Sequence, residues 1–133
     1  MVRPVAALIL PGLVAGLAGC AAAAGPDPAP FTPAYGAVDV IGLGDGLVAF
    51  NLSMTGARGP QDVVAFARCQ AAGFALQSDA GFARHLRTKI DEEGGIWRAD
   101  AVYTISSALP RGLRTIDAEV TVADCAERGI PTV

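Results

Sequence analysis

The chain has 133 residues, with 10 Lys or Arg and 13 Asp or Glu, which gives a net charge of −3 at pH 7. This length suits one domain built around one hydrophobic core. The mildly acidic balance, without a run of basic residues, excludes the electrostatic pattern of a nucleic-acid-binding protein, so no nucleic-acid partner is expected.

Residues 1–19 have the composition of a secretory signal peptide. Arg3 supplies a positive charge, and Val5 to Leu17 form an apolar stretch that is too short to span a bilayer as a helix. Small residues ending at Gly19 then precede Cys20. The sequence LAGC at this point resembles the lipobox of bacterial lipoproteins. The alternatives are a plain signal peptide and an uncleaved anchor that contains a cysteine.

The lipobox resemblance implies cleavage between Gly19 and Cys20, and lipidation of Cys20 with a diacylglycerol and an N-acyl chain such as palmitate. Several acyl chains at one residue are enough for stable anchoring, so the membrane is the first expected partner. Because Ala21 rather than Asp follows Cys20, the resemblance favours the outer membrane of a Gram-negative envelope, facing the periplasm. The inner membrane is the alternative.

Loss of the signal segment changes the composition of what remains. Of the charged residues only Arg3 is removed, so nine basic and 13 acidic residues stay, with a net charge of −4. Much of the apolar excess also lies in the signal segment, and it is therefore no evidence for an integral membrane protein. Residues 20–37 are rich in Pro and Ala and are expected to form an extended tether. Residues 38–133 are expected to form a single α+β domain.

The domain is expected to begin with a glycine-rich turn and a strand. Gly42 to Gly46 lack the spacing and the following helix of a phosphate-binding loop, so a plain turn is the better interpretation. Leu47 to Met54 alternate between apolar and small or polar residues, which predicts a half-buried strand. Pro60 then opens a predicted helix that ends near Ser78 to Gly81. Its apolar stripe recurs at intervals of three and four residues and consists of Asp62, Phe66, Cys69, Gly73 and Leu76.

A three-strand meander is expected to follow, over residues 82–91, 96–106 and 115–123. Gly94-Gly95 is a two-residue hairpin signal, and it would oppose Asp91 to Arg98 and Lys89 to Asp100. The three strands would send their alternate apolar residues to the core, namely Phe82, Leu86, Ile90, Trp97, Ala99, Ala101, Tyr103, Ile105, Ile116, Ala118, Val120 and Val122. Ala83 and His85 would face outward, whereas Arg84 would point toward the helix and run along the edge of the core.

The expected fold is therefore a two-layer βαβββ domain of the α+β class. One helix would pack on one face of a four-stranded, largely antiparallel or mixed sheet. The opposite face of the sheet is expected to be polar, so it would either stay in water or bind something.

Two cysteines remain once Cys20 is assigned to the lipid. An even pair in an oxidising compartment favours a disulfide between Cys69 and Cys125, and a redox or metal-binding pair is the alternative. CxxC spacing is absent and the single histidine, His85, is placed on another face, so neither a metal site nor a cofactor is expected.

Candidate catalytic chemistry is limited to His85. A general base needs a cleft and an orienting partner, and an exposed histidine among surface charges is the more ordinary interpretation. Asp91-Glu92-Glu93 could attract Ca²⁺, but these residues lack the spaced ligands of a calcium loop. No catalytic residue is assigned.

The sequences GFARHLRTKI, GGIWRADAVYTIS and LPRGLRTIDAEVTVADC, within residues 62–125, resemble small uncharacterised envelope lipoproteins of alphaproteobacteria. This resemblance implies a location and no activity. The expected function is a lipid-anchored, non-enzymatic structural or protein-interaction module with an envelope protein as partner. The alternative is a domain that binds a small molecule or peptide on the polar sheet face or at a strand edge, and a weaker one is a hydrolase centred on His85.

Overall fold

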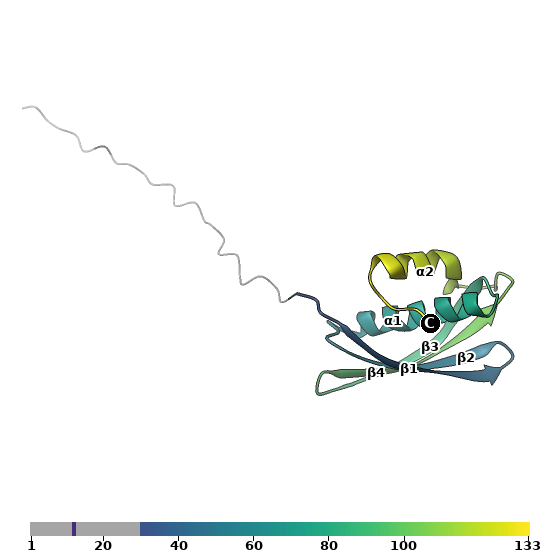
Figure 1. Cartoon of the computed structure of the whole chain (residues 1–133), viewed down its shortest axis with the longest axis horizontal. Coiled ribbons are helices and arrows are strands. Elements are labelled where there is room, and N and C mark those ends of the chain that lie inside the picture. Colours follow the sequence, from purple (N-terminus) through teal and green to yellow (C-terminus); the bar gives the residue numbers. More distant parts are fainter. Residues whose placement is uncertain (1–11, 13–29) are drawn as a thin grey trace, which may run out of the picture.

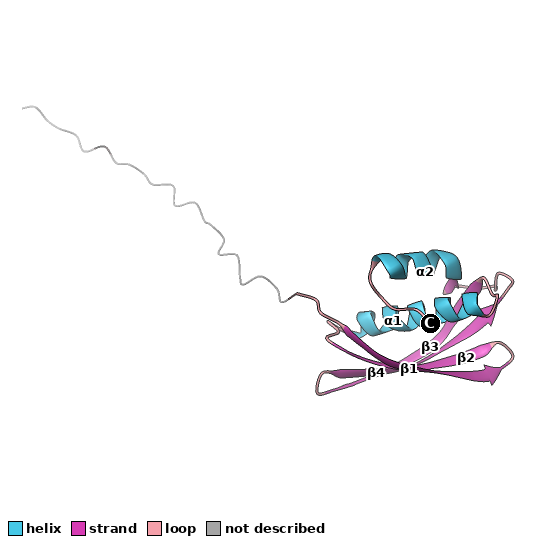
Figure 2. Cartoon of the chain, viewed as in Figure 1, coloured by secondary structure: helices cyan, strands magenta, loops and turns pink. Residues whose placement is uncertain are grey.

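The computed structural model describes residue 12 and residues 30–133, and the cleavage and lipidation predicted at Gly19 and Cys20 therefore lie outside the described residues. One open sheet and two helices make up the domain (Figures 1 and 2). The elements in chain order are β1 (Ala34–Gly44), β2 (Leu47–Thr55), α1 (Pro60–Gln77), β3 (Phe82–Glu93), β4 (Ile96–Ser106), β5 (Thr115–Asp117) and α2 (Ala118–Glu127). None of the helices in these ranges has the length and apolar composition needed to cross a membrane.

The five strands are ordered β1-β2-β4-β3-β5, and every neighbouring pair is antiparallel. The α+β class is therefore confirmed, with five strands and two helices where four strands and one helix were predicted. The hairpin register at Gly94-Gly95 is also confirmed, since Asp91 pairs with Arg98 and Lys89 with Asp100.

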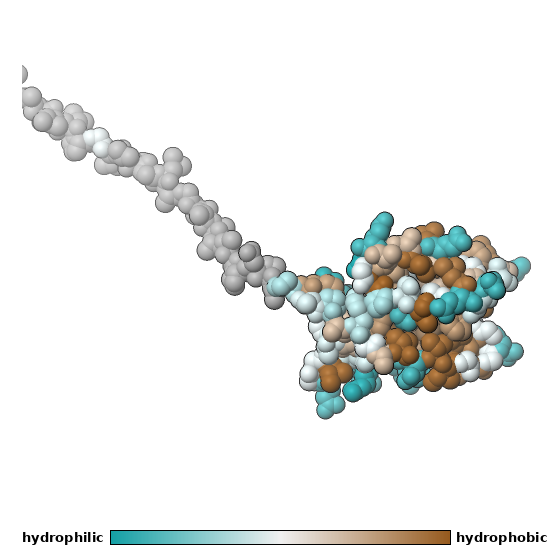
Figure 3. All heavy atoms as spheres, viewed as in Figure 1, coloured by the Kyte–Doolittle hydropathy of each residue, from teal (hydrophilic) through white to brown (hydrophobic). Residues whose placement is uncertain are grey.

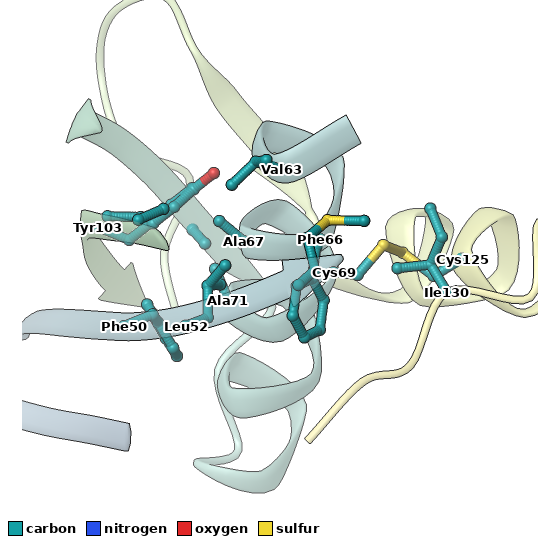
Figure 4. Close-up of a cluster of buried hydrophobic side chains, with 14 of the residues drawn as sticks. Phe50, Leu52, Val63, Phe66, Ala67, Cys69, Ala71, Tyr103, Cys125 and Ile130 are labelled. Atoms are coloured by element: carbon teal, nitrogen blue, oxygen red, sulfur yellow. A yellow bond between two sulfur atoms is a disulfide. The ribbon is translucent and has the colours of Figure 1, made fainter. Parts of the chain in front are cut away.

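Helix α1 covers one face of the sheet over β2, β3 and β4, and α2 packs against α1 (Figure 1). The core lies between α1 and the sheet, where Phe50 and Phe66 are almost fully buried (Figure 4). Small residues on β4, among them Ala101, let the helix approach the sheet closely. The predicted helix is thus confirmed, and of its predicted stripe Asp62, Phe66, Cys69 and Gly73 are buried while Leu76 is half-buried.

Strand β1 begins at Ala34, before the predicted start of the domain at residue 38. Residues 34–37, which composition assigned to the tether, belong to β1, where Ala34 and Tyr35 pair with Thr55 and Met54 of β2. The hairpin between the two strands turns at Asp45-Gly46, where both residues have positive φ of 54° and 76°. Such a turn joins antiparallel strands directly, and Asp-Gly is one of its preferred sequences.

The predicted strand 115–123 is wrong beyond residue 117. Only Thr115–Asp117 pair with β3, and α2 follows at once. Asp117 starts the helix because its side chain accepts a hydrogen bond from the backbone N–H of Val120 at 3.0 Å. The residues of α2 that become buried are Ala118, Thr121 and Cys125, at helical spacing, whereas Val120 is 68% exposed.

A bulge in β3 reverses the predicted orientation of the side chains that precede it and leaves that of the later ones as predicted. His85 pairs with Tyr103 and Arg87 pairs with Val102, so Leu86 is an extra residue in the ladder. Before the bulge, Ala83 is fully buried in the core and His85 lies on the same side as Tyr103. Leu86, predicted to be in the core, is 36% exposed.

Arg84 was predicted to point toward the helix. Because its neighbour Ala83 lies in the core, the Arg84 side chain lies on the opposite face of the sheet. Its guanidinium lies beside Gly112, and a Cβ on that glycine would sit 3.8 Å from Nε of Arg84. The loop 107–114 therefore passes over the Arg84 side chain.

The cysteine pair lies where the two helices meet. Cys69 of α1 and Cys125 of α2 are joined by a disulfide with a Cα–Cα distance of 5.9 Å (Figure 4). Both residues are at most 1% exposed. The bond fixes α2 to α1, because the second cysteine lies inside a helix that the sequence pattern did not predict.

Candidate ligand-binding face

The face of the sheet opposite the helices contains a hollow of about 430 Å³ that extends across four strands. Alternation places polar side chains there, since their neighbours in β2 and β4 point into the core. The lining residues are Ala37, Asp39, Asn51, Leu52, Ser53, Lys89, Asp91, Arg98, Ala99 and Asp100. We call this hollow the polar groove.

Two rows of paired residues form the floor of the polar groove. In the first row Asp39 lies opposite Asn51, Asn51 opposite Asp100, and Asp100 opposite Lys89. In the second row, Arg98 lies between its two register partners, Ser53 and Asp91. Neighbouring side chains on one face of a sheet interact, so the groove presents positive and negative groups side by side.

One ion pair borders the polar groove. Nη1 of Arg87 lies 3.0 Å from Oδ2 of Asp100, with 49% and 38% of the two side chains exposed. Pairs exposed to this degree add little to stability. The ion pair between Arg87 and Asp100 can therefore be replaced by contacts with a bound molecule at a small cost in free energy. Its two side chains offer donors and acceptors to a ligand that carries charges of both signs.

Beside the polar groove this sheet face also carries an apolar row, contrary to the polar face that alternation predicted. Ile41, Ala49 and Val102 are register partners across three strands, on the side of the polar groove nearer the β1–β2 turn. Ile41 is 44% exposed and Leu43, in the same strand, is 53% exposed. Figure 3 shows apolar atoms gathered at the end of the domain away from residue 30.

His85 lies away from the polar groove, on the helix side of the sheet. Its ring packs edge-to-face on Tyr103, with ring centroids 5.2 Å apart, and Nε2 lies 2.7 Å from Oγ1 of Thr88. Burial lowers the pKa of His85, and the charge of Arg114 lowers it further. Burial also raises the pKa of Tyr103 to about 12. These contacts are those of a packed aromatic ring, and the hydrolase hypothesis gains no orienting carboxylate from them.

A second hollow, of about 240 Å³, lies at the start of α1. Its main polar group is Asp62, which is 6% exposed and accepts three hydrogen bonds from Arg58, from the backbone N–H at 2.7 Å, Nη2 at 2.8 Å and Nε at 3.0 Å. The Arg58 side chain holds the pKa of Asp62 below its usual value. Arg58 in turn lies 3.8 Å from the ring centroid of Phe31. The cluster thus ties the segment before β1 to the helix start, which is a structural role.

No group of three or more His, Cys, Asp or Glu residues that could hold a metal ion occurs among the described residues. The acidic run at the β3–β4 turn serves the turn itself, because Oε1 of Glu92 accepts a hydrogen bond from the backbone N–H of Gly95 at 2.8 Å.

Sequence reasoning placed Asn51 and Ser53 on the outer face but missed Asp39. The missing information was strand β1, whose single short alternation of Val38, Asp39 and Val40 follows directly on the Pro-rich segment. The Asp45-Gly46 pair between two apolar stretches was the signal that could have revealed it.

The comparisons with known proteins agree with this fold boundary. Residues 35–129 match the YNQ4 C-terminal domain family, and the chain belongs to this family. It is 33% identical over 87 residues to a Paracoccus denitrificans protein described as "Uncharacterized 26.9 kDa protein in nqo8 5'region". The match covers 65% of this chain and 34% of that relative, so the chain spans about a third of the relative's length. No solved structure is significantly similar to the chain.

Proposed function

We propose that this chain is a lipid-anchored protein of the bacterial cell envelope, and that its domain acts by binding an envelope protein rather than by catalysis. The anchor would be Cys20, by its resemblance to a lipobox cysteine, and the membrane would be the outer one, with the domain in the periplasm. The Cys69–Cys125 disulfide supports an oxidising compartment, because structural disulfides persist there and are rare in the cytosol.

The observation that carries the binding role is the polar groove. Its floor is formed by four paired strands, so the backbone positions of its charged residues are fixed before a partner arrives. Arg98 and Lys89 would receive acidic side chains of a partner, and Asp39 would receive basic ones. Charges arranged in this way set specificity and the rate of association more than raw affinity.

The experiment replaces Asn51, at the centre of the groove floor, with a photo-crosslinking amino acid in living cells. We expect a specific crosslinked protein that disappears when Arg98→Glu is added. The same crosslinker at Glu119, an exposed residue of α2 on the other side of the domain, is the matched control. If Asn51 and Glu119 give the same crosslinks, or Asn51 gives none, the protein-binding role is wrong.

A small molecule or short peptide is the second candidate ligand, and the size of the groove favours it. A volume of about 430 Å³ lies within the range of small-molecule sites, roughly 300–1,000 Å³. Native mass spectrometry of protein purified from the envelope would show a retained mass that Arg98→Glu removes. An unchanged mass for both proteins excludes a ligand that survives purification.

A further inference from the structure

The loop between β4 and β5 exposes apolar and basic side chains together. Its sequence from residue 109 to 114 is LPRGLR. Leu113 is 87% exposed and Leu109 is 69% exposed, and these are the two highest values among the large apolar side chains that the structure describes. Arg111 and Arg114 are exposed beside them. We call residues 107–114 the LPRGLR loop.

The loop is held in this conformation by the rest of the domain. At one end Oγ of Ser106 donates to the backbone carbonyl of Ala108 at 2.7 Å. At the other end the carbonyl of Arg114 accepts a hydrogen bond from the backbone N–H of His85 at 3.1 Å. Gly112 and Arg114 both have positive φ, of 106° and 69°. Hydrogen bonds thus tie down both ends of the loop, and Leu109 and Leu113 project into solvent between them.

Basic charge is concentrated around the LPRGLR loop although the chain as a whole is acidic. Arg84 lies beneath Gly112, and Nε of Arg84 is buried without a hydrogen-bond partner among the described residues. With Arg111 and Arg114, three guanidinium groups thus belong to or adjoin the same loop. The exposed guanidinium groups of Arg111 and Arg114 are suited to bind phosphate.

We propose that the LPRGLR loop is a membrane-contact site for anionic phospholipid. Leu109 and Leu113 enter the interface between headgroups and acyl chains, while Arg111 and Arg114 contact lipid phosphates. Leucine beside arginine is the combination that interfacial segments use, because apolar burial and attraction to anionic lipid act together. The inference goes beyond the proposed binding role and does not require the anchor at Cys20.

The position of the loop is compatible with an anchor on the same membrane. The strand registers place the loop at the end of the sheet opposite Ala34, as Figure 1 shows. Ten residues from Cys20 to Pro30 reach at most about 35 Å, and an 11-residue strand such as β1 is about 36 Å long. The loop can therefore reach the bilayer that holds the anchor when the domain lies on its side. The polar groove, which lies nearer the β3–β4 turn, stays free for a partner.

The test uses the full chain with Cys20→Ser, so that no lipid is attached, and vesicles of phosphatidylglycerol and phosphatidylcholine. We expect Leu109→Ser with Leu113→Ser to weaken partitioning to the anionic vesicles by on the order of tenfold, because two leucines no longer enter the interface. Val120→Ser on α2, which is 68% exposed, is the matched control and should leave partitioning unchanged. Arg111→Gln with Arg114→Gln should remove the preference for anionic over zwitterionic vesicles.

Residues 1–19 carry an apolar stretch of their own, so a second readout reports on the loop alone. Leu113→Trp in a Trp97→Phe background should be quenched by lipids brominated on their acyl chains, whereas Val120→Trp in the same background should not. Vesicle binding that is equal for the leucine variant and the Val120→Ser control overturns the inference. So does quenching that is equal at residues 113 and 120, and so does a chain that fails to bind anionic vesicles.

Discussion

Removal of the Cys69–Cys125 disulfide should be the most destabilising local change that leaves the sheet intact. The two cysteines are 56 residues apart in the sequence. In the chain-entropy description, a loop of this length restricts the unfolded chain by about 14 cal/mol/K, or about 4 kcal/mol at 25 °C. A domain of about 100 residues loses roughly 4 °C or more of Tm per kcal/mol, so Tm should fall by about 15 °C or more.

The assay is urea unfolding in a Cys20→Ser background, where no third thiol can exchange with the pair. The unfolding free energy is measured for the oxidised protein, the reduced protein and the Cys69→Ala, Cys125→Ala variant. The reduced protein keeps both sulfur atoms in the core, so it separates the loss of the crosslink from the loss of packing. Reductant should not change the variant further.

Two results would refute this reasoning. One is a loss of less than about 1 kcal/mol on reduction, which would mean that the crosslink does not restrict the unfolded chain as described. The other is recovery of two alkylatable thiols in protein that was exported to the periplasm and never reduced, which would mean that the disulfide is not formed in the cell.

Two further predictions concern titrating groups. Asp62→Asn should lower the unfolding free energy by about 1.5–3 kcal/mol at pH 7, because it removes the charge that Arg58 binds. Folding lowers the pKa of Asp62, so its ionised carboxylate stabilises the folded chain above about pH 4, and this stabilisation is lost as the pH falls through the folded pKa. The unfolding free energy of Asp62→Asn, measured during an acid titration, should not show this loss. Folding also lowers the pKa of His85, which means that the folded chain binds a proton at this residue less readily than the unfolded chain does. The free energy of unfolding therefore declines as the pH falls below about 6.5. Tm measured from pH 7.5 to 5 should therefore fall less in His85→Gln than in the native chain, and parallel curves would show that His85 does not titrate against folding.

Local sequence patterns were sufficient to predict the elements whose apolar residues recur with a single clear period or whose turn has a characteristic sequence. The stripe from Asp62 to Leu76 identified α1, and Gly94-Gly95 identified the β3–β4 hairpin and its register. The Cys69–Cys125 pair followed from counting cysteines. The signals for α1 and for the hairpin lie within short segments, whereas the cysteine pair depends on the count over the whole chain.

The errors arose where two patterns coincide or where one residue shifts a pattern. Ile116, Ala118, Val120 and Val122 alternate as a strand would, and the same segment also fits a helix with Ala118 and Cys125 on one face. The extra residue Leu86 exchanges the two faces of the part of β3 that precedes it, which places His85 on the core side. The polar groove was only partly predicted, because Asp39 enters it from a strand whose pairing depends on contacts made far away in the sequence.

The lipid anchor at Cys20 is the central claim, and the mass of the N-terminal peptide tests it most directly. The chain would be expressed in a Gram-negative bacterium and purified from its membranes, and its N-terminal peptide would be measured before and after removal of the acyl chains. The account predicts a chain that begins at Cys20 and carries a diacylglycerol and an N-acyl group. A chain that begins at Met1, or one in which Cys20 has a free thiol, would contradict it.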